Sequence, residues 1–412
     1  MANIFQDVQT YNDSDLALLV NSFAFLNLSN SKFKDFDKIE KQLGSTVTFD
    51  QPPRFTTTGS LVVSFQDVEQ LTNSLTVNNA ESVAYNFTAQ QFIFNARDYM
   101  EKFGKSAMAE LGTKVEANIA QVCERETFRF YGDGVTPISS YSQLANALAL
   151  FRNFGAAKDN TVGILDDLSF PRVVNSGLNQ FALERNNKEA MSWEIGRFSN
   201  CDWYQSNLLP THTAGSEGIN GSTLTVVSTT TNSAGAVTSI TFSGTNGASD
   251  ADSVKAYDKF QFSDGVSGQT DLRFLTYIGH EQSQNPVQFR ATADAASTGA
   301  SQVTVSIYPA LQATAGKDQN INTAIVAGMQ CTVLPSHRCG LIMAGNPLYM
   351  AMPRLPEETP FPTARSTDPV SGCSLRTYFG SQFGQNSRGM VHDVIWGKKL
   401  VDEYAMMVAL PL

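Results

Sequence analysis

Residues 216–311 constrain the fold of this chain most, because they carry the pattern of consecutive short β-strands. Apolar and polar residues alternate in the segments STLTVVSTTT, AVTSITFS and QVTVSIYPAL, and β-branched residues are frequent in them. Gly, Asn, Asp and Ser separate these segments, as is typical of strands that are joined by turns. The sequence on either side has helical patterns as well as strand patterns. We therefore predict an all-β module inserted into an α+β protein.

The clearest helical pattern covers residues 95–127. Apolar side chains recur there at spacings of three and four, which places them on one face of a helix. They are Phe103, Ala107, Leu111, Val115, Ile119 and Val122. At a rise of ~1.5 Å per residue, this helix would span on the order of 45 Å. Such a length suits a spine that braces an extended molecule.

Two further patterns precede this helix. A helix with one apolar face is expected from Asp13 or Ser14 to about Leu28. Alternation over 44–66, in STVTFD and LVVSFQ, predicts a long hairpin. The tip of this hairpin would carry Pro52, Pro53, Arg54 and Phe55. Because an isolated ribbon is marginally stable, the hairpin is expected to need a partner surface, either in its own domain or in another molecule.

The remaining segments predict a mixture of helices and strands. Helices are expected over 140–155, ending at Gly155, and in SFPRVVNSGLNQFALERNN, with Pro171 in the first turn. TVGILDD at 161–167 predicts a buried strand. The sequence after the module predicts strands and one short helix, and it closes with the apolar strands HDVIWG and YAMMVAL. A buried final strand would attach the C-terminus to the fold.

The charge of the chain restricts its partners. Charged residues make up 17% of the 412 residues, against a usual value of about 25%. A surface with few charges suits extensive protein contact, because little charge must be desolvated, although it equally suits a plain β-rich protein. The formal net charge of −10 argues against a reader of nucleic-acid sequence, which would need a basic face. An acidic wall could still face DNA, which it would repel and leave mobile.

Neither a targeting segment nor a disulfide framework is predicted. The first residues lack a basic region followed by an apolar core, and no run of about eighteen apolar residues occurs. We therefore expect no secretory signal and no transmembrane helix. The five cysteines stand at irregular spacing, at Cys123, Cys201, Cys331, Cys339 and Cys373. They are interpreted as reduced and mostly buried thiols of a cytosolic protein.

Motifs for catalysis and cofactor binding are missing from the sequence. It has no phosphate-binding loop, no G-x-S-x-G elbow and no zincin helix motif. Cys331, His337 and Cys339 could touch a zinc ion, with Cys373 as a fourth ligand, but buried cysteines on strands explain them better. We expect no catalytic residue, no metal and no cofactor.

Two acidic patterns and one aromatic pattern have structural interpretations that are preferred. Asp166 and Asp167 point to opposite faces of a strand, so they are expected to cap or solvate the next loop. An acidic loop lacks the spacing of an EF-hand and is interpreted as solvated. Its residues are Asp250, Asp252, Asp258 and Asp264. An aromatic group could form a sugar platform, but burial in a core or interface is favoured. That group is Trp193, Trp203 and Tyr204.

The order of these parts resembles the major capsid (coat) proteins of tailed phages, which have the HK-97-like fold. The nearer resemblance is to the inserted-domain subgroup, the coat proteins of short-tailed phages of the P-22 type, which carry an inserted β-barrel-like domain. The segments that carry it are SNLLPTHTAGS (206–216), YDKFQFSDGV (257–266), QVTVSIYPAL (302–311) and YAMMVALPL (404–412). The match in order covers nearly the whole chain, although each segment is short.

The resemblance implies a division of the chain into parts. These are an N-terminal arm (1–35), an extended hairpin loop with peripheral strands (36–94), a spine helix (95–130), the first part of the axial and peripheral domains (131–215), the inserted β domain (216–311) and their second part (312–412). It also implies pentamers and hexamers in an icosahedral shell of a virion, assembled in the host cytoplasm. Scaffolding protein, portal, packaged double-stranded DNA without sequence-specific contacts and a decoration protein are the implied partners, with no membrane.

The resemblance also points to contact residues. Neighbouring subunits would touch the arm at Phe23, Phe25 and Phe33, and the hairpin tip at Pro52, Pro53, Arg54 and Phe55. Relatives can bridge capsomers through a charged loop of the insert, but the matching turn TTNSAG (230–235) is short and uncharged. Asp250, Asp252 and Lys255 are the candidates to replace it.

Two other classes of protein remain as alternatives. One is another assembly, such as the shell of an encapsulin-like compartment or a different virion component, which would differ in its cargo. The other is a carbohydrate-acting enzyme with an appended β domain. The enzyme would need paired acidic residues on facing elements, and no convincing pair is found.

Overall fold

The computed structural model describes most of the chain, and its described part forms two compact units. The described residues are 12–13, 15–17, 19, 25, 28–30, 46–51, 53–57, 65–68, 70–155, 160–177, 196–247, 249–263, 272–276, 279–358, 361–368, 372–381 and 387–412. The sheet unit comprises Met1–Asp50, Thr72–Val122 and Asn346–Leu400. The barrel unit comprises Gln51–Leu71, Cys123–Gly345 and Val401–Leu412.

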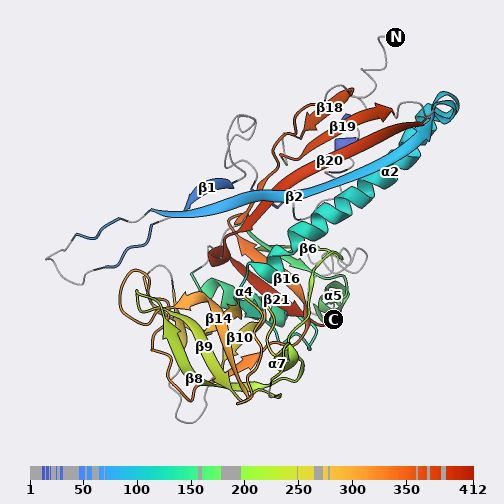
Figure 1. Ribbon diagram of the computed structural model, residues 1–412. Coiled ribbons are helices and arrows are strands. Elements are labelled where there is room, and N and C mark those ends of the chain that lie inside the picture. Colours follow the sequence, from blue (N-terminus) through green and yellow to red (C-terminus); the bar gives the residue numbers. More distant parts are fainter. Residues whose placement is uncertain are drawn as a thin grey trace. The chain divides into compact units, whose positions relative to one another are not determined.

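The sheet unit is built from a six-stranded sheet and one long helix. The strand order is β1-β2-β20-β19-β18, and β17 also pairs with β20. The strands are β1 (Thr46–Gln51), β2 (Leu71–Thr88), β17 (Leu348–Ala351), β18 (Thr363–Thr367), β19 (Ser374–Ser381) and β20 (Ser387–Leu400). Helix α2 (Ala89–Ala120) lies beside β2 and β20 (Figure 1). The buried Trp396 of β20 fixes this packing, because its Nε1 donates to Asn118 Oδ1 of α2 at 3.1 Å.

The long helix α2 confirms that the pattern over 95–127 is helical, but its ends differ. It begins at Ala89 rather than 95, and it stops at Ala120, before the short helix α3 (Val122–Arg125). Leu111, Val115, Ile119 and Val122 are buried as predicted. Ala107 is half-buried, whereas the side chain of Phe103 lies outside the described residues. The spacing of the apolar positions therefore predicted the packed face better than the helix ends.

The predicted hairpin has a different second strand. The partner of β1 is β2, which begins at Leu71, and not the predicted segment at 61–66. Phe65 and Gln66 are not in a strand, and 61–64 lie outside the described residues. The alternation of β2 continues over 18 residues, and its pairing with β20 runs to Thr88. This long ladder outweighs the shorter match, because each added pair satisfies further backbone groups.

The barrel unit contains a closed barrel with the strand order β10-β13-β14-β9-β8-β15. The strands are β8 (Thr223–Thr231), β9 (Val237–Ser243), β10 (Lys259–Phe262), β13 (Gln288–Ala291), β14 (Gln302–Leu311) and β15 (Gln330–Val333). The short helix α7 (Ser216–Ile219) precedes them, and β11 (Arg273–Leu275) pairs with β12 (Gln282–Pro286). Phe242, Phe260 and Phe289 stack in the core, with ring centroids 5.0 to 6.3 Å apart. The prediction of a mainly β segment is confirmed.

The barrel extends beyond the predicted end of the module at 311. Strand β15 closes it by pairing with β8 on one side and β10 on the other, with Cys331 opposite Leu224 and Val333 opposite Phe260. The predicted boundaries assign the sequence QCTV to the second part of the surrounding domains. A strand pattern of this length does not reveal its partners, since pairing is decided by closure of the barrel.

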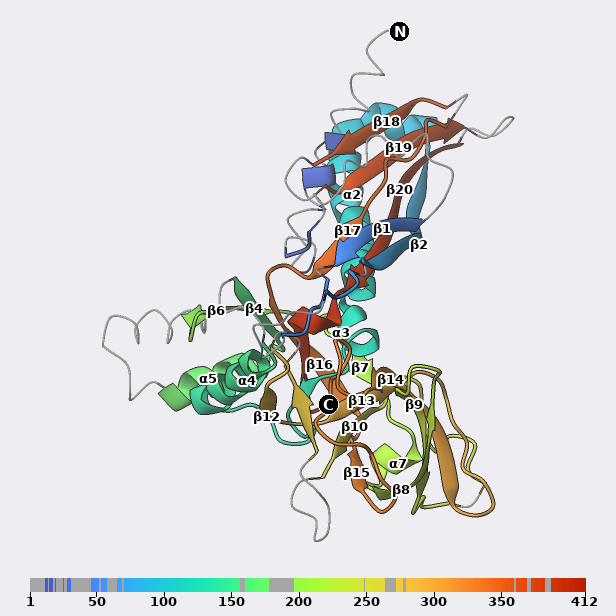
Figure 2. The ribbon, with the colours of Figure 1, turned by 90° about the vertical axis from the view of Figure 1, so that its left-hand side faces the viewer.

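A seven-stranded sheet completes the barrel unit. Its order is β3-β21-β16-β4-β6-β5, and β7 also pairs with β16. The strands are β3 (Phe130–Tyr131), β4 (Thr161–Leu165), β5 (Arg197–Phe198), β6 (Cys201–Gln205), β7 (Thr211–His212), β16 (His337–Ala344) and β21 (Ala405–Leu410). Helices α4 (Tyr141–Asn153) and α5 (Ser169–Gly177) lie side by side (Figure 2).

The local signals around this sheet agree with the structure. Ser140 caps α4 by accepting from Gln143 N, and Gly155 follows the helix with φ of +91°. All of β4 and β21 is buried, as predicted for both strands. The short helix predicted after the module is wrong for the described residues between 312 and 400, which form strands and connecting segments.

Candidate subunit-contact surfaces

The tip segment, residues 53–57 and 65–68, exposes three large apolar side chains. Phe65 is fully exposed, Val68 is 69% exposed and Phe55 is 54% exposed. The amide of Gln66 links the two halves of the segment, because it accepts from Thr56 N at 3.0 Å and donates to Thr56 O at 2.5 Å. Phe55 directly precedes Thr56 in the sequence, and Phe65 directly precedes Gln66, so the link holds the backbone beside both phenylalanines. The segment therefore offers an apolar surface that the described part of its own chain does not cover.

Arg54 attaches the tip segment to other parts of the barrel unit, to which the segment itself belongs. Its guanidinium donates to the carboxylate of Glu403 and lies 4.0 Å from Asp318 Oδ1. Arg54 and Glu403 are both half-buried, whereas Asp318 is exposed. A half-buried guanidinium–carboxylate pair is stronger than an exposed one, because solvent screens it less. Of the predicted tip residues, Pro53 and Phe55 are exposed, Arg54 is held by these partners, and Pro52 lies outside the described residues.

The arm residue Phe25 does not form a free surface. Its side chain is fully buried, and its backbone N donates to Glu116 Oε1 of α2 at 2.6 Å. Nearby, Asn12 Oδ1 accepts from Thr377 Oγ1 at 2.6 Å, and Asn30 N donates to Leu348 O at 2.7 Å. The described arm residues thus pack within their own sheet unit. Phe23 and Phe33 lie outside the described residues.

The charged loop of the barrel is organised by its own hydrogen bonds. Asp250 accepts from Ser216 Oγ and from Asp252 N, and these bonds lower the pKa of Asp250. Lys255 N donates to Asp258 Oδ2 at 2.8 Å. Asp252 is exposed, whereas Asp250 and Lys255 are half-buried. Asp252 is therefore the residue of this group that is free to meet a neighbour, while Asp250 shapes the loop.

The turn at 230–235 is compact. Asn232 Oδ1 accepts from the backbone N of Ala234 and Ala236, at 3.0 and 2.9 Å. Gly235 has φ of +84°, which a residue with a side chain rarely adopts. The turn projects no charged side chain, so it offers no ion pair for bridging capsomers.

The cysteines are free and buried in the structure. Cys331 belongs to the barrel core, and burial raises the pKa of Cys339 on β16 to about 12. Burial lowers the pKa of His337 to about 4, and its Nδ1 lies 2.7 Å from Pro335 O. Among the described residues, no group of three or more His, Cys, Asp or Glu side chains could hold a metal ion. All five cysteine side chains are buried, as predicted.

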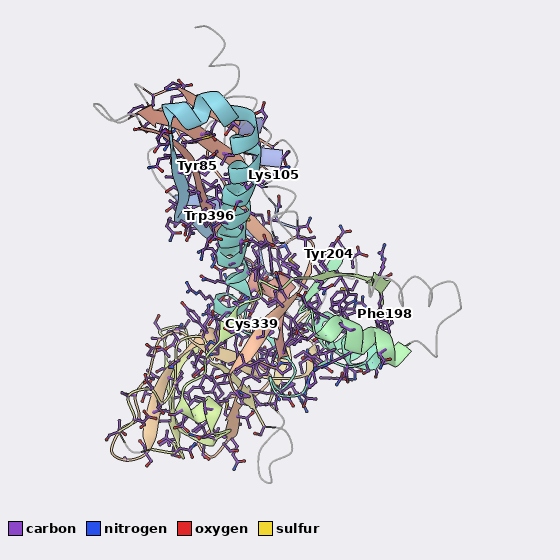
Figure 3. The ribbon with its side chains drawn as sticks, turned by 90° about the vertical axis from the view of Figure 1, so that its right-hand side faces the viewer. Tyr85, Lys105, Phe198, Tyr204, Cys339 and Trp396 are labelled. Carbon is purple, nitrogen blue, oxygen red and sulfur yellow. The ribbon has the colours of Figure 1, made fainter. Side chains whose placement is uncertain are left out.

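The acidic and aromatic patterns also have structural roles. Asp166 is buried and accepts from Ser169 N at the start of α5, at 3.3 Å, whereas Asp167 is exposed. Trp203 is buried against Gly163, where an added Cβ would lie 2.4 Å from the indole ring. Tyr204, at the neighbouring position of β6, is 43% exposed (Figure 3). Adjacent strand residues point to opposite faces, so Trp203 and Tyr204 do not form one platform.

Sequence reasoning missed a buried charged cluster. Glu124 Oε1 of α3 lies 2.9 Å from His212 Nδ1, and Asp258 Oδ1 lies 2.7 Å from His212 Nε2. His212 is 3% exposed and Asp258 is fully buried. Lys259 Nζ donates to Glu124 O at 2.8 Å and to Thr127 O, and burial lowers the pKa of Lys259 to about 7. The partners of His212 are 46 and 88 residues away in sequence, so no local motif reveals them.

Comparisons with known proteins found solved structures with partial similarity but no matching sequence. No family model matches the chain, and no curated protein matches it. A solved structure from Mycobacterium phage Che8 is 9% identical, with a TM-score of 0.48, over 94% of this chain and 90% of that chain. The capsid of cyanophage P-SCSP1u is 11% identical, with a TM-score of 0.44, over 95% and 88%. The virus-like particle from Pyrococcus furiosus is 6% identical, with a TM-score of 0.40, over 97% and 98%.

In the described part of the chain, no helix has the length and apolar character needed to cross a bilayer.

Proposed function

We propose that this chain is a major capsid protein that self-assembles into the icosahedral shell of a tailed double-stranded DNA bacteriophage and performs no catalysis. The exposed tip segment is the observation that carries this proposal. In a monomer, the apolar side chains of Phe55, Phe65 and Val68 would stay in contact with water, whereas a neighbouring copy would bury them. Closed symmetry repeats each such contact around a ring, so a modest contact suffices for a stable shell.

The finer proposal is an HK-97-like arrangement with an inserted barrel. Helix α2 is the spine, and the strands of the sheet unit are the peripheral layer. The seven-stranded sheet with α4 and α5 is the axial domain. The inserted domain is the barrel. Because β15 is one of the barrel strands, we propose that this domain ends at about 334 rather than 311.

The same proposal includes the partners of a phage shell. Hexamers and pentamers of this chain would assemble with scaffolding protein and portal, and a decoration protein could bind outside. The net charge of −10 suits an inner wall that holds DNA without sequence-specific contacts. Assembly would take place in the host cytoplasm.

The experiment is assembly of the chain with and without a candidate scaffolding protein, examined by size-exclusion chromatography and negative-stain electron microscopy. Wild type is expected to form closed shells or capsomer rings. The double variant Phe55→Ser with Phe65→Ser is expected to lose them and stay a folded monomer, because the apolar contact is gone. Val326→Ser is the matched control, since Val326 is 55% exposed outside the tip segment.

Two outcomes would contradict the proposal. A monodisperse wild-type monomer under both conditions would rule against an assembly function. Shells isolated from cells with a protein cargo in place of DNA would favour a compartment shell. Circular dichroism of the double variant shows whether it remains folded.

A further inference from the structure

The buried charged cluster lies where the chain passes between the seven-stranded sheet and the barrel. The chain leaves the sheet through β7 and returns from the barrel through β15 to β16, and His212 pairs with His337 across these two connections. Ala214 N donates to Ser336 Oγ at 3.0 Å, and Leu334 N donates to Lys259 O at 2.9 Å. We call this region the neck, residues 211–215, 258–259 and 333–337.

Three separate segments meet at His212 in the neck. Glu124 comes from α3, directly after the long helix, and Asp258 comes from the start of the first barrel strand after the loop at 249–256. Asp258 Oδ2 also accepts from Gly215 N at 3.2 Å and from Lys255 N at 2.8 Å. The His212 side chain therefore connects α3 and the barrel to the seven-stranded sheet.

The geometry specifies how many protons the cluster holds. An ionised carboxylate is only an acceptor, and a neutral imidazole has a single N–H. Both ring nitrogens of His212 face a carboxylate oxygen at hydrogen-bond distance. Both bonds exist together when the ring carries two protons. With one proton fewer, a nitrogen lone pair faces a carboxylate in a site with little water, which is costly.

We propose that Glu124, His212 and Asp258 form a proton-dependent latch of the neck, which holds the barrel to the seven-stranded sheet while the imidazole carries both protons and loosens when it loses one. The latch concerns the folded subunit and does not depend on the proposed shell function. In an assembly, it would let pH change how firmly the barrel is attached.

The groups packed around His212 define the direction of this pH effect. Burial alone would lower the pKa of His212, but its hydrogen bonds with Asp258 and Glu124 raise the pKa above the ordinary 6.5. A raised pKa in the folded state means that the stabilisation is complete below 6.5 and is lost as pH rises through the raised value. The His337 ring, 5.4 Å away, has a pKa lowered by burial to about 4 and is neutral in this range.

Three other titratable groups lie in or beside the neck, and none of them has the pH dependence of His212. Burial keeps the Cys339 thiol neutral, with its pKa raised to about 12. Burial opposes ionisation of Glu124, but its hydrogen bond to His212 lowers the Glu124 pKa below 4.5, and the charges of Arg125 and Lys259 add to this effect. The bond between Glu124 and His212 is therefore lost through protonation of Glu124 only in acid. Lys259 has the opposite effect on stability from His212. Its pKa is lowered to about 7, so the cost of burying its charge disappears as pH rises toward 10.5, and the folded state gains stability in that range.

The test measures the proton state and the opening of the neck separately. Nitrogen-15 labelling of the four histidines in the full chain reports the protonation of the His212 ring, assigned with His212→Gln. A doubly protonated ring at pH 6 is expected. Hydrogen–deuterium exchange of the neck, corrected for the intrinsic rate, should then show opening that increases by up to roughly tenfold per pH unit above 6.5, until the raised pKa is passed.

Variants identify the source of the pH effect. His212→Gln should exchange faster at pH 6 and lose the increase of opening with pH, whereas His280→Gln, at a histidine outside the neck, should behave as wild type. Lys259→Met removes the opposing titration, so the increase should become steeper. A neutral His212 ring at pH 6 would overturn the latch, and so would an unchanged pH dependence in His212→Gln. If His212→Gln does not fold, the nitrogen-15 signal of the wild-type His212 ring still shows whether the ring is doubly protonated at pH 6, and this alone supports or overturns the latch.

Discussion

At the scale of single residues, Gly397 of β20 shows how little room the sheet unit leaves. A Cβ at this position would lie 2.6 Å from Thr76 O and 2.6 Å from Leu75 Cδ2 on the neighbouring strand β2. The pairing of the two strands shifts register between Val77 and Asn79, next to this close approach. A glycine is therefore required by contact with the neighbouring backbone, since carbonyl oxygens of a ladder cannot move aside cheaply.

The first prediction is that Gly397→Ala destabilises the sheet unit by about 1–3 kcal/mol, as overpacking does elsewhere. Gly389→Ala is the matched control on the same strand, because its Cβ would meet its nearest atom, Tyr85 O, at 3.9 Å. Thermal and urea unfolding of both variants measure the difference. An equal effect of the two substitutions would show that the close approach at Gly397 does not matter.

At the scale of elements, the N-terminal segment is held by polar contacts as much as by apolar ones. Phe25 and Leu19 are buried. In addition, Glu116 accepts a hydrogen bond from Phe25 N, and Thr377 donates one to Asn12. Asp15 lies close to His392, with Oδ2 3.9 Å from Nε2. Burial raises the pKa of Asp15 to about 6 and lowers the pKa of His392 to about 4, so neither charge is favoured there.

The second prediction concerns the pH dependence of this element. Because the folded-state pKa of Asp15 is raised from 3.8 to about 6, its contribution to docking is lost as pH rises through 6. Backbone amides of Asp15, Leu19 and Phe25 should exchange more slowly at pH 5 than at pH 7.5, after correction for the intrinsic rate. In Asp15→Asn this difference should vanish, with slow exchange at both values. Asp13→Asn is the control, and a difference that persists in Asp15→Asn would refute the assignment.

At the scale of the whole molecule, the barrel combines its own core with a connection to the rest of its unit. Phe242, Phe260 and Phe289 stack inside it, and Phe128 and Phe154 from outside the barrel strands join the same core. Strand β15 is separated from β14 by residues 312–329, yet it is the strand that closes the barrel. Removal of β15 would leave the edges of β8 and β10 unpaired, which invites aggregation.

The third prediction is that a fragment of residues 216–334 folds alone, whereas a fragment of 216–311 does not. The longer fragment keeps every barrel strand, so it should unfold cooperatively and remain monomeric. The shorter fragment should aggregate or lack dispersed amide signals in NMR spectra. Equal folding of both fragments would show that β15 is dispensable. Phe128 and Phe154 are missing from both, so their loss affects the two fragments alike.

The sequence by itself determined the elements whose signal is local. Alternation predicted the strands of 216–311, the spacing of Leu111, Val115 and Ile119 predicted the packed face of α2, and Ser140 and Gly155 marked the ends of α4. These patterns arise from the periodicity of one element against one apolar environment, so a short window of sequence contains them.

The tertiary structure alone decided which elements meet. The partner of β1, the closing strand of the barrel, and the carboxylates beside His212 all come from distant parts of the chain. A strand pattern states that a partner exists and does not say which one, and a lone histidine gives no sign of its neighbours. Pairing is decided by the closure of sheets and by the burial of whole surfaces, which depend on many segments at once.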